Sequence, residues 1–136
     1  MLSKKTYVAL SCTWGIIMTL IGSIAYVVLV VAGKKPIKNK YGVAFMIGSG
    51  WGGLDIGPVA IVNENPTERI LNHEFGHSIQ NCYFGPLFPF LIAIPSVIRY
   101  WYREYLVRSG KKKSWELPPY DSIWFEGDAT RIGSEY

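Results

Sequence analysis

Two histidines and a glutamate in the stretch LNHEFGHSIQ are the residues of this chain most suited to chemistry. His73 and His77 are the only histidines among 136 residues, and they stand four positions apart. On an α-helix, residues four apart project from one face, so both imidazoles can bind one Zn²⁺ at about 2.0–2.1 Å. Glu74 follows the first histidine, where its carboxylate can take a proton from a metal-bound water. The spacing predicts a zinc site with Glu74 as general base; the alternative is a helix whose histidines are merely hydrogen-bonded.

A catalytic zinc site needs a third protein ligand and an open fourth position. Since no histidine remains, the third ligand must be a carboxylate. The downstream candidates are Glu104, Glu116, Asp121, Glu126, Asp128 and Glu135. Glu126 is the best of them, because it follows Ile123, Trp124 and Phe125, and an unpaired carboxylate in such an apolar stretch would be costly to bury.

Helix signals surround the histidine pair. Asn65 can cap a helix, Pro66 fits the first helical position, and Glu68 can reach back as in a capping box. The helix should run to about Tyr83, where Gly85-Pro86 stops it.

The predicted helix separates its apolar residues from its histidines. Its apolar stripe consists of Leu71, Phe75, Ile79 and Cys82. His73 and His77 fall on a different face, together with Gln80. The histidines are therefore expected to face a site and not the core.

HEFGH followed by a glutamate on a second helix resembles the gluzincin branch of zinc metallopeptidases. Their second helix typically reads E-x-x-x-D, in which the glutamate binds the metal and the aspartate supports a histidine. Here Glu126 keeps the first position, and Thr130 stands where the aspartate is expected. Asp128 and Asp55 are the alternatives for that supporting role. The resemblance implies Zn²⁺, a peptide or protein substrate and a minimal α+β zincin-like domain.

Two further resemblances bear on function. LNHEFGHSIQ, FGPLFPFLIAIPS and the final E-x-x-A-x-R-I-G resemble small bacterial membrane-associated proteins of metallopeptidase type, over roughly residues 41 to 133. HEFGH is also the form common in site-2-type intramembrane proteases. That reading conflicts with the charged residues Glu68 and Arg69 in the motif helix and with the lack of a later Asp-Gly span. The third alternative is a non-catalytic membrane scaffold with a structural or degenerate HExxH.

The amino-terminal stretch from Thr6 to Gly33 carries no formal charge. A continuous helix of this length would exceed the roughly 30 Å hydrocarbon layer of a bilayer. The sequence predicts a transmembrane anchor over residues 1–33, followed by the catalytic domain over 34–136. A cleaved signal peptide fits less well, because its apolar region runs only about 7 to 15 residues.

A second uncharged stretch, Cys82 to Ile98, is interrupted by prolines. A full crossing there would put Glu126 on the opposite side of the membrane from the histidines. We therefore expect a re-entrant or interfacial segment. The lysines that follow the anchor are expected to bind anionic lipid headgroups, and no nucleic-acid partner is expected. By the positive-inside rule they weakly favour a catalytic domain on the cytoplasmic side of a bacterial inner membrane.

Two strands are expected between the anchor and the motif helix. Tyr41 to Ile47 and Pro58 to Val62 should pair as a hairpin with a long connection, and one of them should form an edge that binds extended substrate. Gly48 to Gly53 formally matches GxGxxG, but no helix follows, so no nucleotide cofactor is expected. A short helix should begin near Ser122. The candidates for stabilising the oxyanion of the reaction are Tyr120, Arg131 and Tyr136.

Overall fold

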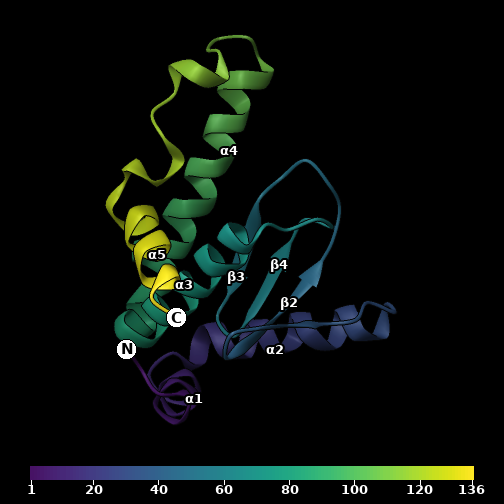
Figure 1. Ribbon diagram of the computed structural model, residues 1–136, viewed down its shortest axis with the longest axis vertical. Helices are drawn as coiled ribbons and strands as arrows, with labels where there is room; N and C mark the ends of the chain where they lie inside the picture. Colours follow the sequence, from purple (N-terminus) through teal and green to yellow (C-terminus); the bar gives the residue numbers. More distant parts are fainter.

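The computed structural model describes residues 1–136 as an α+β fold built around a four-stranded sheet (Figure 1). The strands are β1 (Ile37–Asn39), β2 (Gly42–Met46), β3 (Gly53–Ile56) and β4 (Val59–Val62). They lie in the order β1-β2-β4-β3. β1 is antiparallel to β2, β2 is parallel to β4, and β3 is antiparallel to β4.

The predicted strands exist, but their pairing was predicted wrongly. Residues 41–47 and 58–62 contain β2 and β4, which are neighbours and run parallel. The hairpin forms instead between β3 and β4, where Gly57 adopts φ +69° in the turn. β1 and β3 are therefore the edge strands, and both strands proposed for an edge position lie inside the sheet.

Helices cover both faces of the sheet, and the alternation of side chains shows which face each one takes. α2 (Ile16–Val31) packs on one face, where Tyr26 contacts Phe45 with ring centroids 5.5 Å apart. α3 (Glu68–Phe84) packs on the other face, where Ala44 belongs to a core cluster with Leu71. Because successive strand residues point to opposite faces, Ala44 and Phe45 serve two different layers.

The expected continuous helix from Thr6 to Gly33 is broken. α1 (Lys4–Cys12) and α2 are bent by 93°. Polar groups within the apolar run hold α1 against α3: the hydroxyls of Tyr7 and Ser78 hydrogen-bond at 2.6 Å, and Ser11 lies 3.6 Å from the Cys82 sulfur. No single helix of the structure is both long and apolar enough to span a membrane.

The chain also turns back within the expected re-entrant segment. After α3, one 3-10 turn (η1, Gly85–Leu87) and one π turn (η2, Pro89–Ala93) lead into α4 (Ile94–Arg108), which extends away from the sheet (Figure 1). The two helical stretches that meet here are bent by 118°. This pair and the α1–α2 pair reach the length and hydropathy of a membrane span only when their halves are combined.

The carboxyl-terminal segment returns along α4 to the motif helix. It forms two 3-10 turns, η3 (Ser114–Glu116) and η4 (Tyr120–Ser122), and then α5 (Trp124–Ser134), close to the helix expected from Ser122. α5 packs on α3, at the left of Figure 1.

Candidate metal centre

The histidine helix begins two residues later than its sequence suggested. Thr67, not Asn65, is the N-cap of α3, and its hydroxyl accepts a hydrogen bond from the backbone N–H of Ile70 at 3.2 Å. Asn65 lies in the preceding turn, where its N–H donates to the Asn63 side chain. The helix is nonetheless in place from Glu68 onward and carries the whole HEFGH stretch.

Two glycines let α3 and α5 approach closely. A Cβ on Gly76, inside HEFGH, would overlap with the carbonyl group of Ala129. A Cβ on Gly133 would overlap with the carbonyl group of Asn72 in the same way. The helix backbones therefore touch at both positions, and this proximity lets a side chain of α5 reach the histidines.

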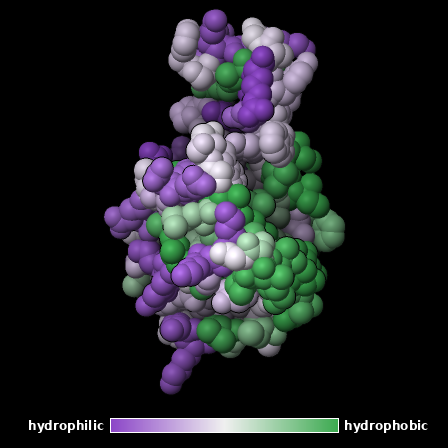
Figure 2. All heavy atoms as spheres, turned by 90° about the vertical axis from the view of Figure 1, so that its right-hand side faces the viewer, coloured by the Kyte–Doolittle hydropathy of each residue, from purple (hydrophilic) through white to green (hydrophobic).

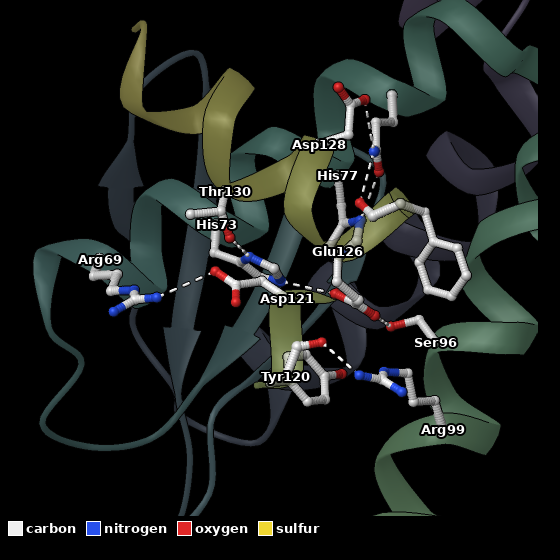
Figure 3. A network of polar contacts seen from close by, with 12 residues as sticks. Arg69, His73, His77, Ser96, Arg99, Tyr120, Asp121, Glu126, Asp128 and Thr130 are labelled. Carbon is white, nitrogen blue, oxygen red and sulfur yellow. Dashed lines mark hydrogen bonds and ion pairs between the residues drawn. The ribbon is translucent and has the colours of Figure 1, made fainter. Parts of the chain in front are cut away.

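The structure brings His73, His77 and Glu126 together. The Nε2 atoms of the two histidines lie 3.0 and 3.1 Å from one oxygen, Glu126 Oε2 (Figure 3). One nitrogen or oxygen atom from each of the three residues lies within 4.8 Å of the other two. Glu126 is fully buried. Two imidazole nitrogens and one carboxylate oxygen are the donor set that Zn²⁺ takes in His₂Glu sites.

Gln80 fixes the orientation of His77. The Gln80 amide nitrogen donates to the Phe125 carbonyl at 2.9 Å and to Asp128 Oδ2 at 3.1 Å. Both partners are acceptors, so the amide oxygen must be the atom 2.7 Å from His77 Nδ1. An amide oxygen only accepts, and His77 Nδ1 therefore carries the proton.

This tautomer tests whether the site suits a cation. With its proton on Nδ1, a neutral His77 directs the lone pair of Nε2 at Glu126 Oε2, which is itself an acceptor. Two facing lone pairs at 3.1 Å require either a second proton on the imidazole or a cation between them. The buried donor set thus fits a metal ion.

The other histidine has its own supporting residue. His73 Nδ1 lies 2.9 Å from the Thr130 hydroxyl. Thr130 thus contacts a histidine from the position where gluzincins carry aspartate. Asp128 contacts no histidine; it accepts from Gln80 and pairs with Arg131 at 2.6 Å.

Asp55, the third candidate for supporting a histidine, lies on β3. Its carboxylate accepts a hydrogen bond from the Gly57 N–H at 3.1 Å, and no hydrogen bond joins it to either histidine. Burial, followed by the nearby Glu74 carboxylate, raises the pKa of Asp55 well above its usual range. Asp55 does line the cleft described below.

Ser96 of α4 was not anticipated from the sequence. Its hydroxyl donates to Glu126 Oε1, so the carboxylate is held from both sides. Burial opposes ionisation of Glu126, but the contacts with His73 and His77 outweigh it and hold the Glu126 pKa well below its ordinary value. Nothing in the local sequence marks this serine, thirty positions from its partner.

Glu74 lies beside the three convergent residues without joining them. Its side chain packs against Gly53 of β3, where an added Cβ would lie 2.7 Å from Glu74 Oε1. Burial raises the pKa of Glu74 to about 7, with His73 lowering it and Glu126 raising it. A buried carboxyl group that titrates near neutrality is suited to proton transfer.

Two adjoining cavities, of about 160 and 370 Å³, form a cleft at the centre. Both are lined by Gly53, His73, Glu74, Tyr100 and Tyr120. The smaller has an apolar wall from η2 and α4, and the larger extends towards Arg69 and Thr130. β3, an edge strand, therefore lies beside a cleft that continues on both sides of His73.

Only one of the three residues considered for stabilising an oxyanion lies in this cleft. Tyr120 points towards Glu126 (Figure 3), and burial, then Glu126, raises the Tyr120 pKa to about 12. Arg131 pairs with Asp128 and Glu135 outside the cleft. The Tyr136 hydroxyl accepts from the Leu2 N–H at the amino terminus.

The remaining carboxylates considered as ligands lie elsewhere. Asp121 pairs with Arg69, and Glu104 pairs with Arg108. Glu116 caps a short turn by accepting from the Lys113 N–H, and Glu135 pairs with Arg131. No family model, curated protein or solved structure matches the chain.

Proposed function

We propose that this chain is a zinc-dependent metallopeptidase in which His73, His77 and Glu126 hold the metal. The observation that carries the proposal is the convergence of two imidazole nitrogens on one buried carboxylate oxygen, with His77 already protonated on its other nitrogen. When bound there, Zn²⁺ supplies the Lewis acidity that makes water a nucleophile near neutral pH.

Glu74 is the general base of the proposed reaction. It borders both cavities, is buried, and belongs to the residue type that takes the proton of the attacking water and returns it to the leaving amine. Its contact with Gly53 fixes the carboxylate between β3 and the histidines. Glu74 is thus held in position by backbone, without a bond to the metal ligands.

Tyr120 is the residue proposed to stabilise the oxyanion. With a pKa of about 12, its hydroxyl keeps its proton at neutral pH and can donate to a developing negative charge. Arg99 holds the tyrosine by donating to its backbone carbonyl at 3.0 Å (Figure 3).

The substrate proposed is an extended peptide. β3 pairs with β4 on one side only, so its other side has main-chain groups free for a further strand. The cleft continues past His73 in both directions, which suits a chain cut in its interior.

Replacement of Glu74 by Gln tests the proposed mechanism. The variant should bind zinc as the wild type does, because Gln removes a proton acceptor and not a ligand, and it should lose hydrolysis of a fluorogenic peptide library by at least about 100-fold. Full activity in Glu74→Gln would make the proposed base wrong. Zinc binding without hydrolysis in the wild type would favour the scaffold alternative.

A further inference from the structure

α2 exposes apolar side chains around most of its circumference. Among its residues only Met18 and Gly22 are buried. Its most exposed apolar side chains, between 49 and 82% accessible, are Leu20, Ile21, Ile24, Val27, Val28 and Val31; Ile17 and Val30 are 41 and 43% accessible. A helix that packs on a sheet in water normally turns a charged face to solvent. α2 has no charged residue at all.

The turn-back between α3 and α4 extends this surface. Met18 of α2 belongs to one buried cluster with Phe88 and Ile92, and α2 contacts η1. On the outside of that contact η2 and α4 expose further apolar side chains: Phe90, Leu91, Ile94, Ile98 and Trp101. These residues and the exposed ones of α2 are called the apolar surface below. Figure 2, which views the molecule from the end of α2, shows apolar atoms gathered along one side.

Lysines follow both helices of the apolar surface. Lys34, Lys35 and Lys38 follow α2 and are exposed, and Lys111 to Lys113 follow α4. The first acidic residue of the chain is Asp55, and no acidic residue occurs between Glu74 and Glu104. An apolar area bordered by lysines complements a layer with an apolar interior and anionic headgroups. A second copy of the chain would instead bring like charges together.

We propose that the apolar surface docks into one leaflet of an anionic lipid bilayer. α2 has 16 residues and is therefore about 24 Å long, shorter than the roughly 30 Å hydrocarbon layer. The 93° bend before it and the 118° bend before α4 keep each pair of helices from running straight through the layer. The chain thus enters the bilayer from one side without crossing it.

Docking in this way gives the cleft a defined position. Val97 and Trp101 line the smaller cavity, and both are more than a third exposed. The apolar wall of the cleft therefore continues into the surface that meets the lipid. This places the candidate metal centre at the level of the headgroups.

Sedimentation with lipid vesicles tests the proposal on the full-length chain. Wild type should bind phosphatidylcholine vesicles that contain phosphatidylglycerol more strongly than vesicles of phosphatidylcholine alone. The double variant Ile24→Glu, Val28→Glu should bind at least about tenfold more weakly. Tyr83→Glu, at an exposed aromatic position of α3 outside the apolar surface, should bind as wild type does. Far-UV circular dichroism checks that each variant is folded.

Several results would overturn the proposal. Lipid docking is excluded if the wild type does not bind vesicles, or if the double variant binds them as strongly as the wild type does. If the protein forms a stable dimer and does not bind vesicles, the apolar surface is instead an interface with a second copy. Labelling of single cysteines at positions 63 and 134 from opposite faces of sealed vesicles would show a crossing chain. His77→Ala should bind vesicles as wild type does, so failure of the metal proposal stays distinguishable from failure of this one.

Discussion

Replacement of Gln80 by Leu should weaken zinc binding although Gln80 is not a ligand. Leucine has a similar volume, but it removes the amide oxygen that accepts from His77 Nδ1 at 2.7 Å. Without that acceptor, the proton of His77 is no longer held on Nδ1. The ring can then rotate, so Nε2 is no longer held in the orientation that binds the metal. Loss of such an orienting partner typically weakens metal affinity about 10–100-fold, or about 1.4–2.8 kcal/mol.

The same change should also lower the stability of the fold. Gln80 Nε2 donates to the Phe125 carbonyl and to Asp128, so Leu removes two hydrogen bonds, each worth about 0.5–1.5 kcal/mol. Zinc affinity is measured by competition with a chelating dye at a temperature where the variant is folded. Thermal unfolding without metal measures the stability change separately.

Ser78→Ala is the matched control for this experiment. Ser78 lies on α3 two residues before Gln80, is equally buried, and hydrogen-bonds Tyr7 of α1. Its loss should lower stability while zinc affinity stays unchanged. If Gln80→Leu kept the wild-type affinity, or if Ser78→Ala lost as much, the orienting role assigned to Gln80 would be refuted.

Two further substitutions separate the metal ligands from the general base. Glu126→Ala should weaken zinc affinity at least about 100-fold in the same dye competition. Glu116→Ala and Glu135→Ala, both outside the centre, should leave the affinity unchanged. Equal losses in all three variants would leave the third ligand unidentified. Gly53→Ala should displace the Glu74 carboxylate, because the new Cβ would lie 2.7 Å from Glu74 Oε1. It should lower kcat about 10–100-fold and leave zinc affinity unchanged. An unchanged kcat would contradict the role of Gly53 in positioning Glu74.

The convergence of the site could be anticipated because its signals are local. His73 and His77 share a helix face through their spacing, and Gln80 follows on the same face three positions later. Glu126 stands out because its neighbours are apolar, and a buried carboxylate needs partners. Thr130 and Asp128 were considered together for one role, and the structure gives them different partners: a histidine for Thr130, Gln80 and Arg131 for Asp128.

The features that the sequence did not predict depend on contacts between distant residues. The break between α1 and α2 lies in an apolar run that reads as one helix, and it is accompanied by the Tyr7–Ser78 contact across 71 positions. β3 follows β2 in the sequence, yet it lies at the edge of the sheet, and β4 lies between the two and pairs in parallel with β2. The periodicity of the sequence does not predict this strand order. Ser96 reaches Glu126 only because α4 packs beside the centre.

The zinc content of the purified chain tests the central claim most directly. Wild type loaded with zinc and then dialysed should retain about one equivalent by inductively coupled plasma mass spectrometry, because two imidazoles and a buried carboxylate converge on one point. His77→Ala, treated in the same way, should retain essentially none. A wild type that retains no zinc, or a His77→Ala variant that retains as much as wild type, would contradict the account.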